Sequence, residues 1–295
     1  MITLLQLDYF RRLAASEHIT ATARELYISQ TALSSMIINL EKELGVQLFD
    51  RSRRSIRLNA AGRTYLAYVN QVFAALDNGR AAIRDLEESR NQQVSIAVGS
   101  SLVWTPMLHA FHSHYPDTVF KQLNLTVDEL NQALEEMAVD YVIAGSDDIS
   151  AQGLSRVHIK DDWIYLCVPE SHPLASREFV YLNDVKDEPF ISVQPGSPWR
   201  ACCDRLFEKA GLNIHICVEC DYTMRAPLIT SGFGVALTTS TAKSVDLLKP
   251  NRYIRIADEY AKRDMCLFWN PSRYMSQAAL IFKNFCVQFY KGAAL

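Results

Sequence analysis

The N-terminal fold is decided by residues 19–34, which have the sequence ITATARELYISQTALS. A short helix is expected to begin after Thr20, whose hydroxyl can accept a hydrogen bond from a free amide of the first turn. After a turn, Ser29 can cap a longer helix that ends near Leu44, and Gly45 suits the left-handed conformation of a helix C-terminus. This stretch therefore predicts two helices joined by a tight turn.

The second of these helices has an apolar face and a polar face. Its apolar residues recur at helical spacing and predict a buried stripe, formed by Leu33, Ile37, Leu40 and Leu44. The polar residues of its first turns are Gln30, Thr31, Ser34 and Ser35. In a helix-turn-helix they would face the major groove of DNA, where Gln can pair with adenine and Ser or Thr with several base edges. Thr20, at the start of the preceding helix, is also predicted to bind DNA. The alternative is a three-helix bundle with a solvated polar face.

A basic segment follows the helix pair. Arginine occupies four of the seven positions 51–57, between two β-prone stretches. We expect a β-hairpin, called the wing below, whose Arg51, Arg53 and Arg54 reach phosphates or the minor groove. A solvated charged loop is the alternative. Residues 1–63 carry nine Lys and Arg against six Asp and Glu, and the rest of the chain carries 21 against 27. Only the N-terminal part is therefore expected to meet a polyanion.

A long helix is predicted from Asn59, because no Pro follows for over forty residues and Asn is a good helix cap. Apolar positions alternate steps of four and three, as in a coiled coil. The predicted dimerisation residues are Leu66, Val69, Phe73, Leu76 and Ile83. A homodimer is expected because two paired DNA-binding units can read a pseudo-palindrome. The alternative is a helix that packs on its own domain.

The rest of the chain, residues 94–295, alternates strands with helices and predicts an α/β unit with a mostly parallel sheet. Ligands of such sheets bind beyond the carboxyl ends of strands, near helix N-termini. Two loops fit, residues 99–101 and 194–199, and they would hold a carboxylate or a similar anion. The predicted effector-binding residues are Ser100, Ser101, Pro195, Gly196, Ser197, Trp199 and Thr223. Plain helix capping is the alternative role of the hydroxyls.

Composition excludes several classes of protein. An apolar fraction of 49% excludes global disorder, and the absence of an apolar run of about 18 residues argues against a membrane span. The N-terminus lacks the pattern of a secretory signal, and an odd number of scattered Cys, seven, does not form a disulfide scaffold. A cytoplasmic protein is therefore expected. No catalytic or nucleotide-binding motif is present, so neither enzyme activity nor a cofactor is predicted.

Titratable residues outside these patterns receive weaker predictions. The histidines at positions 109, 112 and 114 share a helix, but no further ligand stands nearby, and no metal site is predicted. Acidic residues 147, 148, 161 and 162 are interpreted as solvated turn residues. A thiol-responsive regulator, acting through Cys202 or Cys203 near the second loop, is an alternative function. A small-molecule binding protein without a DNA-regulatory role is another.

Residues 19–34, 40–51 and 58–62 together strongly resemble the LysR-type transcriptional regulators, and residues 169–174 and 231–235 extend the resemblance. The resemblance implies the following domains: a winged helix-turn-helix over 1–58, a linker or dimerisation helix over 59–90, and an effector-binding domain over 91–295. That domain would be of periplasmic-binding-protein type, with one subdomain at 91–160 plus 266–295 and another at 161–265. Dimers that pair into tetramers, pseudo-palindromic promoter sites, an effector and contact with RNA polymerase are implied as well.

Two positions depart from the family pattern. Thr31 stands where Pro usually follows the Ser-Gln pair, and Ser35 stands where the family often has Arg or Lys. The loss of a basic side chain at position 35 removes a phosphate or guanine contact. The prediction therefore places the base contacts on Gln30, Thr31, Ser34 and the wing.

Overall fold

The computed structural model describes residues 1–51, 56–87, 93–100 and 102–291. The chain folds into two compact units, Met1–Arg80 and Ala81–Leu295. No helix of the described residues is both long enough and apolar enough to cross a membrane.

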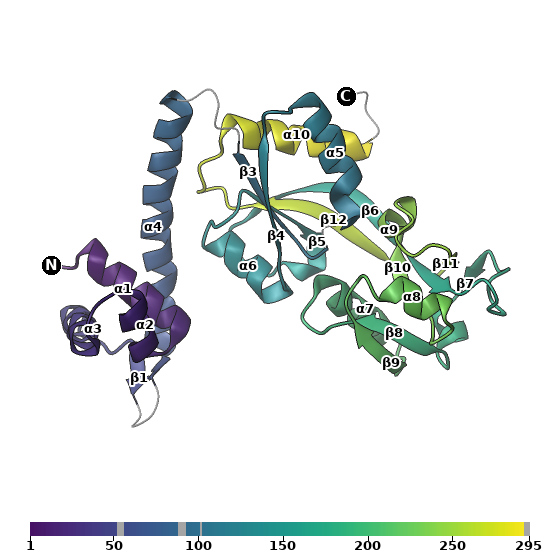
Figure 1. The fold of residues 1–295 in the computed structure, drawn as a ribbon, viewed down its shortest axis with the longest axis horizontal. Coiled ribbons are helices and arrows are strands. Elements are labelled where there is room, and N and C mark those ends of the chain that lie inside the picture. The colour runs from purple at the N-terminus through teal and green to yellow at the C-terminus, as the bar shows by residue number, and fades with distance from the viewer. Residues whose placement is uncertain (52–55, 88–92, 101, 292–295) are drawn as a thin grey trace. The chain divides into compact units, whose positions relative to one another are not determined.

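The first unit has three helices, a β-hairpin and the start of a long helix (Figure 1). In chain order they are α1 (Leu4–Ser16), α2 (Ile19–Glu25), α3 (Gln30–Leu44), β1 (Phe49–Arg51), β2 (Ile56–Leu58) and α4 (Ala60–Glu87). The stripe of α3 packs as predicted: Leu33, Ile37 and Leu40 are buried, with Leu44 at the edge of the core. Ser29 caps α3, and Gly45 ends it at φ 71°.

The start of α2 differs from the prediction. His18 is the cap residue, because its Nδ1 accepts a hydrogen bond from the backbone amide of Ala21 at 3.3 Å. Thr20 therefore lies inside the first turn and is exposed. The prediction that Thr20 caps this helix is wrong, because an imidazole nitrogen takes the role usually given to a short hydroxyl side chain.

The wing strands pair antiparallel, with Phe49 opposite Leu58. The buried carboxylate of Glu41 accepts hydrogen bonds from the backbone amides of Leu48 and Phe49 at 2.8 and 3.3 Å. Helix α3 thereby fixes the point where the wing begins. The predicted tip residues Arg53 and Arg54 lie outside the described residues.

Gly62 is required where α4 meets the wing. A Cβ atom at this position would lie 2.1 Å from the carbonyl oxygen of Leu48. Gly62→Ala is expected to lower the free energy of unfolding by about 1–3 kcal/mol, because backbone cannot yield as a flexible side chain can. Urea denaturation of the full chain measures this change in the free energy of unfolding. Thr64→Ala is the control, since this exposed residue of the same helix should change stability by less than about 0.5 kcal/mol; an equal loss in both variants would contradict the prediction.

The second unit contains a curved mixed sheet flanked by helices (Figure 1). Its elements are β3 (Gln93–Val98), α5 (Thr105–His114), β4 (Val119–Asn124), α6 (Val127–Glu135), β5 (Tyr141–Gly145), β6 (Ser155–Val168), β7 (Phe179–Val180), β8 (Pro189–Val193), α7 (Pro198–Lys209), β9 (His215–Cys220), α8 (Arg225–Thr230), β10 (Ala236–Thr239), α9 (Ser240–Ser244), β11 (Arg252–Ile256), β12 (Lys262–Trp269) and α10 (Gln277–Lys291). A short 3₁₀ turn, η1 (Leu102–Trp104), precedes α5.

The sheet order is β4-β3-β5-β12-β6-β11-β7, and β10 pairs with β6. Strands β3, β4 and β5 are parallel, whereas β12 runs antiparallel to both β5 and β6. The α/β class is confirmed, but the prediction of a mostly parallel sheet is wrong, because the returning strands β10, β11 and β12 all pair antiparallel with β6.

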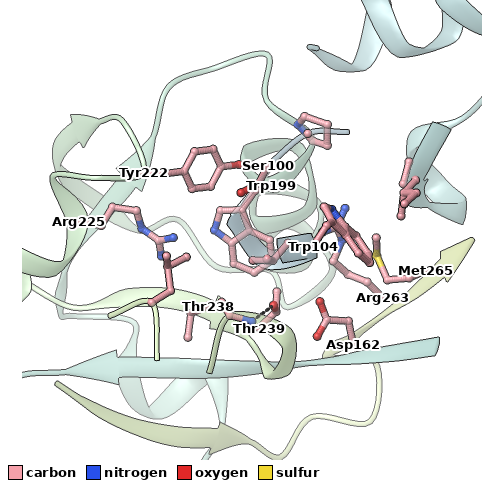
Figure 2. Close-up of a pocket in the computed structure, with 17 residues that line it drawn as sticks. Ser100, Trp104, Asp162, Trp199, Tyr222, Arg225, Thr238, Thr239, Arg263 and Met265 are labelled. Carbon is pink, nitrogen blue, oxygen red and sulfur yellow. Dashed lines mark hydrogen bonds between the residues drawn. The ribbon is translucent and has the colours of Figure 1, made fainter. Parts of the chain in front are cut away.

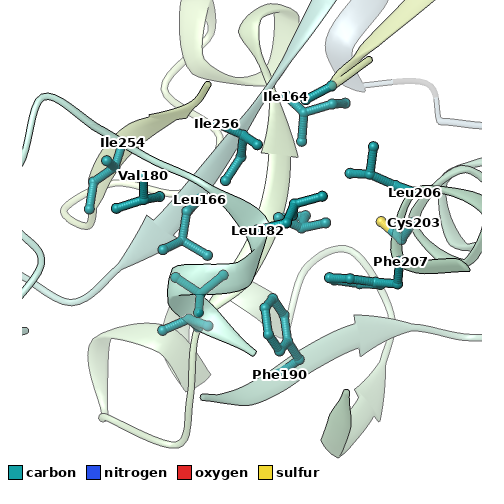
Figure 3. Packing of buried hydrophobic residues seen from close by; sticks show 14 of the residues in the cluster. Ile164, Leu166, Val180, Leu182, Phe190, Cys203, Leu206, Phe207, Ile254 and Ile256 are labelled. Atoms are coloured by element: carbon teal, nitrogen blue, oxygen red, sulfur yellow. The ribbon is translucent and has the colours of Figure 1, made fainter. Parts of the chain in front are cut away.

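Strand β6 belongs to two halves of this unit. Its Ile159 packs into the core under α5 and α10, whereas Leu166 packs into a separate core with Phe190 and Phe207 (Figure 3). The subdomain boundaries expected after residues 160 and 265 thus fall inside continuous strands, β6 and β12. These two strands physically join the halves.

Candidate functional site

A small cavity lies between the two halves of the C-terminal unit (Figure 2). Its volume is about 50 Å³. On the same measure, a cavity needs about 10–15 Å³ to hold one water molecule. Its apolar walls include the indoles of Trp104 and Trp199 and the side chain of Met265. The space therefore suits a small molecule with an apolar body.

Arg225, the first residue of α8, places a buried positive charge in the wall of this cavity. Its side chain is only 3% exposed and one terminal nitrogen donates to the carbonyl oxygen of Leu237. Its Nε has no hydrogen-bond partner, and Arg225 makes no ion pair within the described part of the chain. A buried cation without a counter-ion is costly, so an anion entering the cavity would be stabilised there.

Arg263 and Thr238 add polar groups that can form further hydrogen bonds. Arg263 pairs with the buried carboxylate of Asp148 at 2.7 Å, yet its Nε has no partner. The hydroxyl of Thr238, on β10, also has none. Both residues line the cavity, and Figure 2 shows Arg225 and Arg263 on opposite sides of it. The cavity can therefore offer donors from two directions to a single bound anion.

Asp162 lines the cavity from β6 and is buried. It accepts hydrogen bonds from the Ser240 hydroxyl at 2.7 Å and the Thr241 amide at 2.8 Å. The interpretation of Asp162 as a solvated turn residue is wrong, because its carboxylate holds the first turn of α9 against β6. It is also wrong for Asp148, which is buried because it pairs with Arg205 and Arg263.

The predicted effector-binding residues divide into three groups. Ser100 and Trp199 line the cavity, whereas Ser101 lies outside the described residues. Pro195 and Gly196 are exposed and do not line it. The carbonyl of Gly196 instead accepts the Val127 amide at 3.1 Å and so connects this loop to α6.

The hydroxyls of the other two predicted residues serve the backbone. Ser197 caps α7 by accepting the Arg200 amide at 3.1 Å. Thr223 is exposed and does not begin a helix; its amide donates to Asp221 Oδ1 at 2.8 Å, and its hydroxyl bonds the same oxygen. Neither residue lines the cavity. Capping, the alternative role, accounts for Ser197, and a local turn accounts for Thr223.

Sequence reasoning missed Trp104, Tyr222, Arg225, Thr238 and Arg263, which all line the cavity. A signal existed for one of them. Arg225 is the sole charged residue of the stretch 224–237, and an isolated charge among apolar residues suggests a buried functional group. Burial also raises the pKa of Tyr222, so its phenol stays protonated at neutral pH.

The predicted DNA-binding face lies at the start of α3. Gln30, Thr31 and Ser35 are exposed, and Ser34 is half-buried. Tyr27, in the turn before α3, is almost fully exposed and has a positive φ of 56°. No sequence pattern indicates Tyr27 as part of this face, because its exposure follows from the turn geometry.

The predicted dimerisation residues of α4 differ in burial: some pack on the core of the N-terminal unit and others are exposed. Val69 is 2% exposed and packs with Leu66 and Phe73 into the core of the N-terminal unit. The prediction that Val69 contacts a second chain is wrong, since its own domain buries it, whereas Leu66 and Phe73 are only half-buried and stay predicted dimer contacts. Leu76 and Ile83, which are 39% and 57% exposed, remain free, and Tyr68 and Val72 are exposed beside them.

All seven cysteines are unpaired. Burial raises the pKa of Cys202 above its ordinary value, and burial does the same for Cys203. A reactive thiol needs the opposite shift, because the thiolate is the nucleophile. The thiol-responsive alternative therefore gains no support at these two positions.

A winged helix-turn-helix followed by an α/β unit with an internal cavity defines a DNA-binding regulator that carries its own ligand-binding unit. Residues 4–63 match the family model described as "Bacterial regulatory helix-turn-helix protein, lysR family", and residues 67–291 match the "LysR substrate binding domain". The chain belongs to the LysR family of transcriptional regulators.

Relatives and solved structures of this family match along the whole chain. The HTH-type transcriptional regulator YybE of Bacillus subtilis is 31% identical over 97% of this chain and 98% of its own length. The transcriptional dual regulator GltC of the same organism is 27% identical over 97% of each chain. Full-length OxyR from Pseudomonas aeruginosa has a TM-score of 0.66 at 22% identity, covering 100% of this chain and 96% of its own. Full-length CbnR complexed with its target DNA has a TM-score of 0.64 at 21% identity, covering 98% of this chain and 100% of its own.

Proposed function

We propose that this regulator binds pseudo-palindromic promoter sites as a homodimer, which pairs into a homotetramer, and that a small organic anion in the Arg225 cavity controls it. The observation that carries the effector part is the buried guanidinium of Arg225, whose Nε has no hydrogen-bond partner. Charge-assisted hydrogen bonds from arginine to a carboxylate are among the stronger polar contacts in proteins. The indoles of Trp104 and Trp199 would cover the apolar part of the same molecule.

The position of the cavity supports a mechanism of control. Its walls come from both halves of the C-terminal unit: Trp104 precedes α5, whereas Trp199 and Arg225 belong to α7 and α8. A ligand that contacts both halves favours the arrangement in which both reach it. The altered arrangement would change the spacing of the DNA-binding units in the oligomer. RNA polymerase is the further partner that this model expects.

The proposal is tested by footprinting the upstream region of the protein's own gene with and without small organic acids. The acids are first ranked by thermal shift of the purified protein. We expect protection of a pseudo-palindromic site, with a footprint or DNA bend that changes at saturating ligand. An unchanged footprint with a tightly bound acid would overturn the coupling, and no retardation of that DNA at low salt would overturn the DNA-binding role.

Gln30 is expected to read a base. Gln30→Ala should relax the preference at one position of the site and cost about 1–3 kcal/mol against the preferred base, because Gln can make a bidentate contact to adenine. Binding to a set of single-base operator variants measures this. Equal losses on all four bases at that position would contradict the role.

Arg53 is expected to contact phosphate and not a base. Arg53→Ala should weaken binding to all sequences alike and lower the salt slope, the change of log K with log salt concentration, by about one unit. Titrations at several salt concentrations measure the slope. Arg252→Ala, an exposed arginine of the C-terminal unit, is the control that should leave the slope unchanged. A sequence-selective loss in Arg53→Ala would assign this residue to base recognition instead.

A further inference from the structure

A second group of polar side chains lies on neighbouring strands, apart from the cavity. His158 extends from β6, and Asp264 and Cys266 extend from β12. One ligand atom from each residue lies within 4.8 Å of the other two. His158 Nδ1 contacts Asp264 Oδ1 directly, and the Cys266 thiol donates to the same oxygen at 3.6 Å. Nitrogen, oxygen and sulfur donors thus converge on one point.

A β-bulge creates this convergence. Lys160 is opposite Met265, but the pairing then shifts, so that His158 and not Ile159 is opposite Cys266. Ile159 and Met265 pack into the core under α5 and α10, whereas Cys266 packs on the other face of the sheet with residues of α6. The bulge therefore brings the imidazole to the face that carries the thiol. Bulges often re-aim side chains in this way at functional positions.

We propose that His158, Asp264 and Cys266 form a Zn²⁺ site, with a water molecule as the fourth ligand. Tetrahedral zinc has bonds of about 2.0–2.3 Å to such donors, which places the ligand atoms about 3.3–3.8 Å apart. The 3.6 Å between Cys266 Sγ and Asp264 Oδ1 fits this range, whereas His158 Nδ1 and Asp264 Oδ1, now in direct contact, would have to move apart to admit the ion. On binding, the thiol proton leaves to solvent and the imidazole binds through Nδ1, with its proton on Nε2. Bonds from the cation replace the hydrogen bonds that now join His158 and Cys266 to Asp264.

The surroundings of the cluster support this site. Asp161 Oδ1 lies 3.8 Å from His158 Nε2, the position of the carboxylate that orients many zinc-bound histidines. Lys262, the nearby cation, is paired with Asp161 at 3.0 Å.

An ion can reach the cluster from solvent. The His158 side chain is 53% exposed, whereas Cys266 is buried behind it. Asp264 also lines a surface hollow together with Ser146 and Lys262. The histidines of α5 do not offer an equivalent site, because no three-ligand group within the described residues includes them.

Metal binding by the full-length protein tests the site. After chelator treatment, Zn²⁺ is titrated by calorimetry, and Co²⁺ serves as a spectroscopic probe because a thiolate ligand gives a charge-transfer absorption in the near ultraviolet. We expect one ion per chain and a thiolate band that Cys266→Ser removes. His158→Gln should weaken Zn²⁺ binding at least about tenfold, since even an outer partner of a zinc ligand is worth 10–100-fold.

Matched variants decide between this site and others. Cys217→Ser changes a half-buried thiol outside the cluster, and His112→Gln changes an exposed histidine of α5; both should leave Zn²⁺ and Co²⁺ binding unchanged. The exposed position of His158 makes His158→Gln informative even if Cys266→Ser folds poorly. A thiolate band that survives Cys266→Ser, or Zn²⁺ affinity that depends on His112 and not on His158, would overturn the site.

Discussion

Replacing Arg225 with Met is expected to remove at least about half of the stabilisation that a small carboxylate gives to the wild-type protein. A ligand at 100 times its Kd adds about 2.7 kcal/mol to the free energy of unfolding. Hydrogen bonds to charged groups contribute about 1.5–3 kcal/mol, so loss of the guanidinium should raise Kd by about 10–100-fold. At the same ligand concentration the stabilisation would then fall to about 0.4–1.4 kcal/mol.

The stability of the ligand-free variant is governed by two opposing effects. Met removes a buried cation that has no counter-ion, which stabilises the fold. It also leaves the carbonyl of Leu237 without the donor it has from Arg225, which costs about 1–3 kcal/mol. The informative quantity is therefore the ligand-induced shift of the melting temperature, measured against each variant's own ligand-free value.

The measurement uses the carboxylate that gives the largest shift with the wild-type protein. Arg252→Met is the matched control, because Arg252 is exposed on β11 and away from the cavity. This control should keep the full shift. If Arg225→Met keeps it too, the effector binds elsewhere and the role assigned to the unpaired guanidinium is wrong.

Local signals made much of the fold predictable from sequence. Ser29 and Gly45 mark the ends of α3, and the Thr126 and Glu129 side chains form a capping box at the start of α6. Each of these features depends on atoms within a few residues of each other. Helix ends of this kind can be identified without knowledge of the tertiary structure.

Apart from the start of α2, where the nearby His18 caps the helix, the errors arose where distant residues decide the outcome. Asp162 resembles a turn residue until α9 supplies its donors from Ser240 and Thr241. The periodicity of α4 shows that Val69 needs an apolar partner but not which chain supplies it. The polar walls of the cavity come from α8, β10 and β12, so no single stretch of sequence contains the site.

The exposed part of α4 is expected to hold the dimer together. Leu76→Asp and Ile83→Asp should each shift the protein from dimer to monomer and raise the dimer dissociation constant at least about 100-fold. Burying a leucine side chain contributes about 1.5–3 kcal/mol, and a symmetric interface loses that contribution twice. Because a pseudo-palindromic site is read by two linked units, affinity for it should fall towards that for a half-site.

Sedimentation equilibrium measures the oligomeric state, and gel retardation with full and half sites measures DNA binding. Leu280→Asp is the control, because this leucine of α10 is also 39% exposed but lies far from α4 in sequence. Val69→Asp separates the two roles of the helix: it should unfold the N-terminal unit, since Val69 belongs to that unit's core. If Leu76→Asp and Ile83→Asp remain dimeric while Leu280→Asp dissociates, the chains associate through the C-terminal unit and α4 serves only as a connection.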